Sequence, residues 1–189
     1  MEYFLSRWKP RSDTNCEQPR ANGCKPEKEA SRACRRLCRA TPHPGTSHLH
    51  GTPEDLATIL VDHLVNANLV GHDSHGVIRI PSYVQAIQRG QIAPAARPRV
   101  IRETPTTALV DGNWAFGQIS ARFGMDLAIR KAKAVGLALV GVVRCNHIGR
   151  LGEYVTRAAA QDVVAVVTVA SPGGKSVAPF GGRQGALGT

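Results

Sequence analysis

Two valine-rich apolar runs, separated by a stretch with helical periodicity, constrain the fold of this 189-residue chain most strongly. Leu137 to Val143 and Val163 to Ala170 are continuous runs of this kind, which are typical of strands covered on both faces. Between them, Leu151 to Gln161 has the spacing of an amphipathic helix. Strand, helix and strand in this order predict a layered α/β domain.

The helix signals upstream of these runs are equally local. Thr52-Pro53-Glu54-Asp55 predicts a helix start, with Thr52 as N-cap and Pro53 at the first helical position. The helix should end between Asn68 and Gly71. Its apolar face is expected to hold Leu56, Ile59, Leu60, His63, Leu64 and Ala67.

Glycine and proline divide the sequence that follows. A second helix is predicted from Pro81 to Arg89, stopped by Gly90, and the proline-rich run from Pro94 to Pro98 reads as a connector. Beyond it we predict a strand from Thr107 to Asp111 and a helix from Gln118 to Val135, which Gly136 closes.

Composition limits the class of protein. No stretch reaches the roughly 20 apolar residues that a bilayer span needs, which argues against a membrane protein. The N-terminus lacks the apolar core of a secretion signal, and five cysteines do not form an even set of disulfides. A reducing cytoplasm is therefore the expected location.

Residues 1–50 differ from the rest of the chain. They carry half of the formal charge of +10, because ten basic residues face five acidic ones. With few aliphatic residues to bury, this Cys- and Pro-rich segment is expected to be disordered. It contains no CxxC pair, so a zinc site is not expected. Its arginines leave a nucleic-acid-binding fragment open as an alternative function: Arg32, Arg35, Arg36 and Arg39.

The segment from Asp73 to Arg79 is the first candidate site. Ser74 stands beside His75, and Arg79 follows the histidine by four residues. An imidazole exchanges protons near neutral pH, a neighbouring hydroxyl can relay that proton, and a guanidinium binds carboxylate in a bidentate manner. A polar loop that caps a helix, with Asp73 or Ser74 as the cap, is the alternative reading.

A second histidine, His147, follows the predicted strand that ends at Val143 and precedes a helix. Ligands of open α/β folds gather at the carboxyl ends of strands, and helix N-termini attract phosphate. A structural role for His147 as a helix cap is the alternative. Cys145 and His147 alone are weak evidence for a metal site, and no metal is predicted.

The sequence from Val169 to Ser176 ends in Gly-Lys-Ser and resembles a phosphate-binding P-loop. That motif requires glycine where Val169 stands, and its lysine should open a helix. Pro179 follows Lys175 closely instead. A P-loop-like nucleotide-binding module is therefore kept only as an alternative function.

Five sequence blocks, taken in order, are similar to the malate/L-lactate dehydrogenase type 2 family. They are GHDSHGVIRIPSYVQAIQRGQIAP, ALVDGNWAFGQISARFGMDLAIRKAKAVG, NHIGRLGEYVTRAA, VAPFGG and GALGT. The resemblance covers about residues 52–189. It implies hydride transfer between NAD or NADP and a 2-hydroxy or 2-oxo acid, and an α/β dehydrogenase fold that is not a Rossmann fold. The absence of GxGxxG agrees with that fold.

The resemblance also implies roles for individual residues. His75 matches the proton donor to the substrate oxygen, which also neighbours the nicotinamide, and Ser74 matches its relay. Arg79 matches the carboxylate clamp, and Ser171 stands at a polar position near the substrate. His147 matches a histidine that acts as the catalytic base in some members. Cofactor contact is implied for Gly149, Arg150 and Leu151.

The resemblance sets the expected organisation as well. Residues 51–105 would form a helical part with the Ser-His-Gly motif, and residues 106–189 the start of a cofactor-binding α/β domain. The family's chains are longer, so a truncated and inactive fragment is one expectation. The expected partners are a small acid substrate and a second copy in a homodimer, with no nucleic acid and no membrane.

Overall fold

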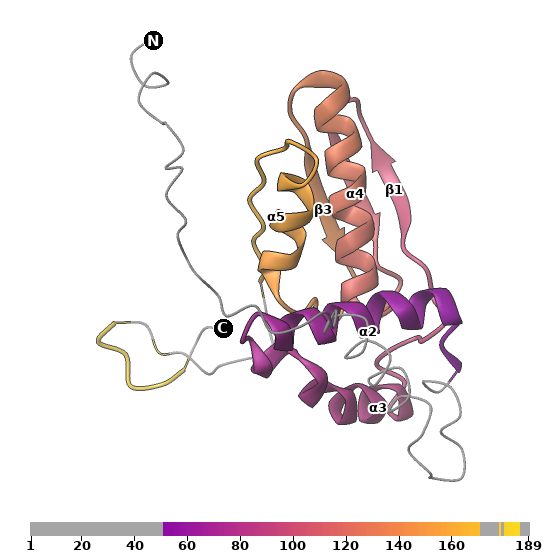
Figure 1. The fold of residues 1–189 in the computed structure, drawn as a ribbon, viewed down its shortest axis with the longest axis vertical. Helices are drawn as coiled ribbons and strands as arrows, with labels where there is room; N and C mark the ends of the chain where they lie inside the picture. Colours follow the sequence, from indigo (N-terminus) through magenta and orange to yellow (C-terminus); the bar gives the residue numbers. More distant parts are fainter. Residues whose placement is uncertain (1–50, 171–177, 179, 186–189) are drawn as a thin grey trace, which may run out of the picture.

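The computed structural model describes residues 51–170, 178 and 180–185. Expectations for residues 1–50, for Ser171 and for Lys175 in the Gly-Lys-Ser motif lie outside the described residues. The described part opens with a helical layer (Figure 1). It consists of α2 (Glu54–Leu69), the short 3-10 turns η2 (Asp73–His75) and η3 (Val77–Arg79), and α3 (Ile80–Gln88).

A three-stranded sheet with two helices follows. The strands are β1 (Arg99–Glu103), β2 (Thr107–Asp111) and β3 (Leu139–Val143), in the order β1-β2-β3. β1 pairs antiparallel with β2, and β2 pairs parallel with β3. The helices are α4 (Gly117–Val135), which joins β2 to β3, and α5 (Leu151–Ala159), which follows β3.

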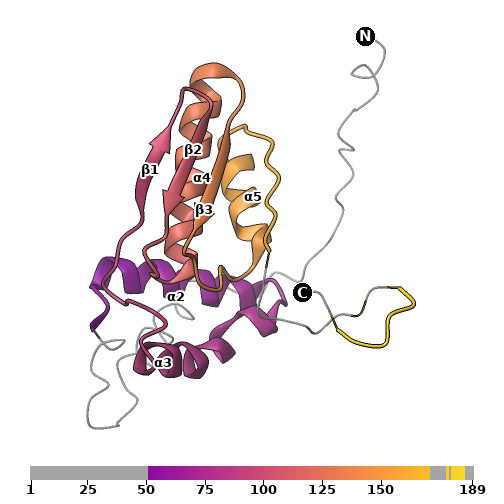
Figure 2. The same cartoon turned by 180° about the vertical axis from the view of Figure 1, so that it is seen from behind.

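The helices lie on one face of the sheet. α4 packs against β2 and β3, and α5 packs beside α4, while no helix of the described part covers the opposite, open face of the sheet (Figure 2). β2 and β3 both run towards α2, so their carboxyl ends meet the helical layer (Figure 2). The loops after these two strands therefore reach the residues between α2 and α3.

Two apolar clusters hold these layers together. The helical layer is joined to α4 by side chains that are almost completely buried: Leu56, Leu60, Leu64, Tyr83, Ile92, Phe116 and Ile119. The second cluster, between the sheet and α4, contains Ala108, Val110 and Leu127. Burying such side chains supplies roughly 1.5–3 kcal/mol each.

Most of the elements predicted from sequence are confirmed. β2 has the predicted bounds, and α4 begins one residue before the predicted Gln118. Gly136 closes α4 with φ +89°, the left-handed conformation that glycine adopts without steric cost. α3 ends before Gly90, also at positive φ. The mixed α/β class is therefore confirmed.

The predicted start of α2 is wrong by one residue. Pro53, not Thr52, occupies the N-cap position, and no side chain caps the helix there. The backbone of Pro53 is extended, with ψ 146°, and its carbonyl accepts the first helical bond, from the amide of Ala57 at 2.9 Å.

The strand predicted at Val163 to Ala170 is also wrong. This segment belongs to no strand, and Val164 is 98% exposed. A strand needs a neighbour to satisfy its backbone, and β3 pairs only with β2 among the described residues. The expectation that the valine-rich runs are covered on both faces fails too, because Leu139 of β3 is 72% exposed.

β1 was not predicted. Its sequence, Arg-Val-Ile-Arg-Glu, is charged at three of five positions, and none of its residues is buried. This strand forms because it pairs with β2. The two paired strands lie on either side of the domain boundary expected between residues 105 and 106, and that boundary stays a prediction. In the described part, no helix is long and apolar enough to cross a bilayer.

Candidate functional site

The Ser-His-Gly turn between α2 and α3 is held by the side chain of Asn68. Its Oδ1 accepts the amide of Val77 at 2.9 Å, and its Nδ2 donates to Asp73. A Cβ on Gly76 would overlap the Asn68 carboxamide, so the turn requires glycine at this position. Asn68 therefore fixes the backbone after His75 and the side chain of Asp73 before it.

His75 is the half-buried imidazole of this turn. Ser74 Oγ lies 2.9 Å from its Nδ1, which leaves Nε2 for other partners. The ring packs edge-on against His72, with centroids 4.5 Å apart. Desolvation, with His72 and Arg79 nearby, lowers the pKa of His75. The neutral imidazole is favoured because a positive charge there would be less hydrated and close to a guanidinium.

Arg79 turns back on the same segment. Its Nε donates to the carbonyl of Ser74 at 2.6 Å, which orients the guanidinium. Among residues 51–170, no carboxylate forms an ion pair with it. Two of its nitrogens are thus available to an anion from solution.

His147 comes from the loop between β3 and α5, far from His75 in sequence. The centroids of the two imidazole rings lie 5.2 Å apart. Nδ1 of His147 is 2.9 Å from the hydroxyl of Tyr83 on α3, and Gln118 Nε2 donates to that hydroxyl at 2.6 Å. Desolvation is the main cause that lowers the pKa of His147 to about 4, and the charges of Arg79 and His75 add to it. This ring is therefore neutral at pH 7.

The His147 loop is fastened through its neighbour Asn146. The Asn146 amide nitrogen lies 3.2, 3.0 and 2.9 Å from the carbonyls of Gln91, Trp114 and Ala115, respectively. The loop also passes so close to the first turn of α4 that a Cβ on Gly117 would overlap the carbonyls of Asn146 and His147.

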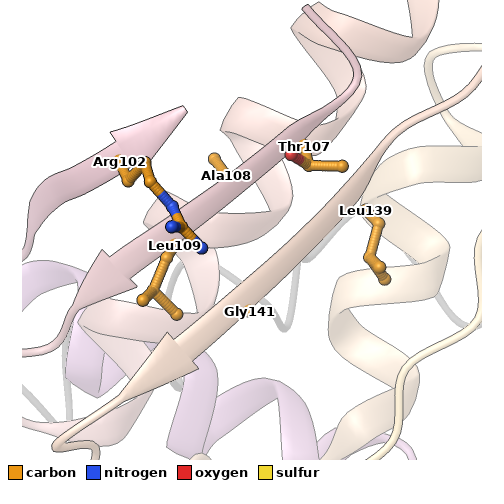
Figure 3. A pocket seen from close by; sticks show the side chains of 6 residues that line it. All are labelled: Arg102, Thr107, Ala108, Leu109, Leu139 and Gly141. Atoms are coloured by element: carbon orange, nitrogen blue, oxygen red, sulfur yellow. The ribbon is translucent and has the colours of Figure 1, made fainter. Parts of the chain in front are cut away.

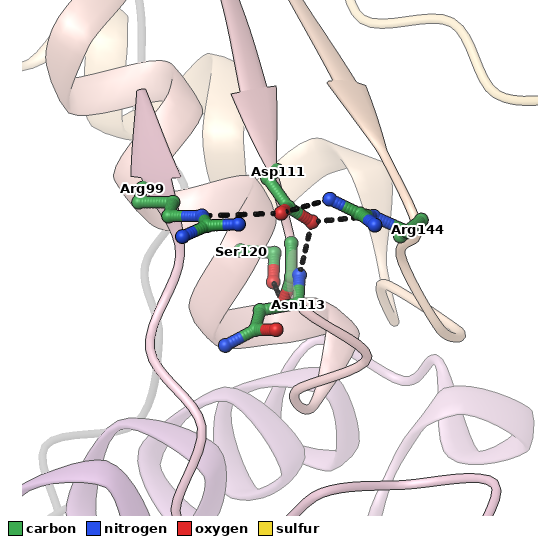
Figure 4. Close-up of polar contacts among 6 residues, drawn as sticks. Arg99, Asp111, Asn113, Ser120 and Arg144 are labelled. Atoms are coloured by element: carbon green, nitrogen blue, oxygen red, sulfur yellow. Dashed lines mark hydrogen bonds and ion pairs between the residues drawn. The ribbon is translucent and has the colours of Figure 1, made fainter. Parts of the chain in front are cut away.

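A charged cluster anchors the start of the same loop (Figure 4). Asp111, fully buried at the end of β2, accepts hydrogen bonds from Arg144 at 2.9 Å, Arg99 at 3.3 Å and the amide of Asn113 at 2.8 Å. The guanidinium of Arg144 is the main cause that lowers the pKa of Asp111. Arg144 has φ +49°, a conformation uncommon for a residue with a side chain.

The residues after His147 lead into α5. Gly149 has φ +75°, and its approach to the ring of His63 leaves no room for a Cβ. His63 Nε2 accepts the amide of Arg150 at 2.9 Å. Desolvation is the main cause that lowers the pKa of His63 to about 4, and the positive charge of Arg150 lowers it further.

The structure thus brings together Ser74, His75, Arg79 and His147, and places Gly149, Arg150 and Leu151 directly after them. Within the described residues, no group of three or more potential ligands could hold a metal ion. Five residues that position this site were not predicted from the sequence: His63, Asn68, Tyr83, Gln118 and Asn146. Only Asn146 could have been suspected from the sequence, because it stands beside His147. The others are not adjacent in sequence to the residues that they position.

A shallow pocket of about 290 Å³ lies elsewhere, on the open face of the sheet (Figure 3). Arg102 and Leu109 line it together with Leu139, next to the backbone of Gly141. It contains no histidine or carboxylate, so it offers no acid–base chemistry.

Comparisons with known proteins bear on this arrangement. The sequence profile of the malate/L-lactate dehydrogenase family matches residues 48–189. L-sulfolactate dehydrogenase of Methanocaldococcus jannaschii is 40% identical over 140 residues, which are 74% of this chain and 40% of that protein. Hydroxycarboxylate dehydrogenase B of Escherichia coli is 40% identical over 139 residues, 74% of this chain and 38% of that protein.

Solved structures show the same likeness. The malate dehydrogenase of Pyrococcus horikoshii has a TM-score of 0.62 and 36% identity, covering 71% of this chain and 36% of that one. The sulfolactate dehydrogenase of Methanocaldococcus jannaschii has a TM-score of 0.59 and 34% identity, covering 72% and 36%. The expected non-Rossmann dehydrogenase fold is thereby confirmed. The chain spans about two fifths of the length of the curated relatives it matches.

Proposed function

The chain belongs to the malate/L-lactate dehydrogenase family, and on this premise we propose that it takes part in hydride transfer between NAD or NADP and a small 2-hydroxy or 2-oxo carboxylic acid. One observation carries the proposal. The ring centroids of His75 and His147 lie 5.2 Å apart, beside the guanidinium of Arg79. No carboxylate in the described part of the chain forms an ion pair with that guanidinium.

Arg79 binds the substrate carboxylate. Its bond to the Ser74 carbonyl uses Nε, so its two terminal nitrogens remain for a bidentate contact. A carboxylate held there lies near both imidazoles, since Arg79 affects the pKa of His75 and of His147. The relatives, named for malate, sulfolactate and hydroxycarboxylates, support an acid substrate.

His75 exchanges the proton of the oxygen on C2. In the direction of oxidation, the hydroxyl proton passes to Nε2 of His75 as a hydride leaves C2, and in reduction the proton returns to the oxygen. Ser74 contacts Nδ1 and holds the ring for this transfer. When bound, a nicotinamide ring supplies the hydride acceptor for oxidation and the hydride donor for reduction.

The residues present fit such a cofactor in charge and backbone chemistry. The amides of Leu151 and Gly152 open α5 and have no acceptor one turn earlier within the helix, and the guanidinium of Arg150, which pairs with Glu153 at 3.4 Å, stands beside them. Both are suited to phosphate. Gly149, Arg150 and Leu151 are therefore the residues we assign to the cofactor.

The test is turnover by the purified chain. NADH and NADPH oxidation would be followed against a panel of 2-oxo acids, and binding of each nucleotide and acid would be measured separately. His75→Ala should lower the rate by roughly 10²–10⁴-fold, the contribution of a general acid. Arg97→Ala, which removes only the surface ion pair with Asp55, should leave the rate unchanged. A folded chain with neither turnover nor saturable binding would refute the proposal for this chain.

The resemblance also supports assembly as a homodimer. Sedimentation equilibrium of the purified chain measures this directly, and a mass that stays that of one chain up to high concentration would refute it.

A further inference from the structure

A chain of three polar side chains links the interior to the candidate site. Gln118, at the start of α4, is 1% exposed, and Tyr83 on α3 is 5% exposed. Gln118 Nε2 donates to the Tyr83 hydroxyl at 2.6 Å, and that hydroxyl lies 2.9 Å from Nδ1 of His147. His147 itself is exposed. A buried amide is therefore connected through a phenol to an imidazole whose contact with that phenol is partly buried.

The donor in the first bond decides the direction of the second. A phenol oxygen carries one proton, and here it already accepts a hydrogen bond from Gln118. Burial raises the pKa of Tyr83, so the phenol keeps its proton at neutral pH. Nδ1 of His147 is the other polar partner of the hydroxyl in the described structure, and it therefore receives the proton in the hydrogen bond.

The orientation of Gln118 agrees with this direction. Its Oε1 is buried without a partner, whereas its Nε2 makes one bond. In the reverse orientation, the amide group with its two N–H donors would occupy the unpartnered position. Buried N–H groups without partners are rarer than under-satisfied carbonyls, so the observed orientation leaves the less costly defect.

We propose that Tyr83, oriented by Gln118, holds His147 with its proton on Nε2, so that His147 serves the reaction as a neutral hydrogen-bond donor and not as the catalytic base. This inference rests on the proposed function for its link to catalysis. Tyr83 and Gln118 are positioning residues, because neither is argued to touch the substrate. The base role that the family resemblance implies for His147 would require a free lone pair on Nε2.

The charged and titratable groups around His147 favour the neutral ring. His75 on η2, Arg79 on η3 and His63 on α2 are the groups that interact with it electrostatically, and none carries a negative charge. A neutral imidazole with Nε2–H can polarise a substrate oxygen without giving up its proton. Proton exchange is then left to His75, which neighbours Ser74 instead of a buried phenol.

The decisive measurement is the tautomer of His147 by ¹⁵N NMR on the full chain, without substrate. The signal is assigned by its loss in His147→Gln. The proposal expects a protonated, pyrrole-type Nε2 and a bare, pyridine-type Nδ1 from pH 6 to 9. A proton on Nδ1, rapid exchange between both tautomers or an imidazolium at neutral pH would each overturn it.

Two tyrosine variants separate the hydroxyl from the ring. Tyr83→Phe keeps the buried ring but removes the donor that stabilises the neutral imidazole, so the pKa of His147 should rise by roughly one unit. Tyr154→Phe is the matched control, because that buried hydroxyl donates to the carbonyl of Ile148. It should leave the His147 titration in place. An unchanged pKa in Tyr83→Phe would overturn the proposal.

These outcomes are distinguishable from failure of the proposed function. The NMR readout needs neither cofactor nor substrate, so an inactive chain can still show the Nε2–H tautomer. Conversely, an active chain with the proton on Nδ1 keeps the dehydrogenase proposal and returns His147 to the role of base.

Discussion

The Nε2 atom of His63, within α2, accepts a hydrogen bond from the backbone amide of Arg150, at the start of α5, over 2.9 Å. The two residues are 87 positions apart in sequence, and the bond ties the first described helix to the last. Because the acceptor is a neutral imidazole, the bond exists only while His63 is unprotonated.

We expect the stability of the chain to fall as the pH drops from about 6.5 to about 4, the pKa values of an ordinary histidine and of His63 here. In that interval the unfolded chain binds more protons than the folded one, so the free energy of unfolding rises with pH. The full effect of His63 is on the order of 3 kcal/mol, because the pKa differs by about 2.5 units between the folded and the unfolded chain. Urea unfolding at a series of pH values measures it.

His63→Gln is the informative variant, since its side-chain oxygen can still accept the Arg150 amide but does not titrate. The slope of stability against pH between 4 and 6.5 should become shallower in this variant. The same change at the exposed His72 serves as the control. An equal slope in wild type and His63→Gln would contradict the prediction.

Gly117→Ala should damage the His147 loop. The added Cβ would overlap two backbone carbonyls of that loop, and backbone cannot move as a flexible side chain can. We expect a loss of about 1–3 kcal/mol of stability, measured by thermal unfolding. Gly141→Ala is the matched control: its Cβ would meet only Leu109 Cδ1, at 3.4 Å. Equal losses in both variants would show that the close approach is not the cause.

Asn146→Asp should be more harmful than Asn146→Ala. Alanine removes the amide that donates to surrounding carbonyls, whereas aspartate points a negative oxygen at the carbonyls of Trp114 and Ala115. We expect roughly 1–3 kcal/mol for the alanine change and a larger loss for aspartate. Urea unfolding at pH 7 compares them. If aspartate proved the milder change, the assigned donor role of Asn146 would be wrong.

Arg79→Lys should weaken binding of the acid substrate and leave cofactor binding unchanged. Lysine keeps the charge but loses the planar fork that binds carboxylate at two points and the Nε that donates to Ser74. We expect KM for the 2-oxo acid to rise roughly tenfold, which is about 1.4 kcal/mol. Arg79→Ala should raise it further. A KM that does not change in either variant would remove Arg79 from the substrate site.

The sequence predicts the elements whose cause is local. α4 and β2 follow from periodicity, and Gly136 follows from the need for a left-handed residue after a helix. β1 was not predicted and the segment from Val163 was wrongly predicted as a strand, because the structure of both depends on a partner elsewhere in the fold. A strand forms only when a neighbouring strand pairs with it. The residues of the charged β1 and of the valine-rich segment do not indicate which partner is present in the fold.

The candidate site divides in the same way. Ser74, His75 and Arg79 share one short motif, so their chemistry could be predicted from spacing and from the family resemblance. Tyr83 and Gln118 read as core residues of their helices, and the fold alone brings them to His147.

The open side of β3 has a practical consequence for handling the chain. Among the described residues, β3 pairs only with β2, so its other edge is unpaired there. This edge and the exposed valines after α5 carry no charge, and they lack the lysines or prolines with which natural sheets block addition of foreign strands. Strands of separate molecules can therefore add to one another at these places. Concentrated samples should precipitate or form fibrils sooner than dilute ones, and Val166→Lys should raise the concentration at which this begins.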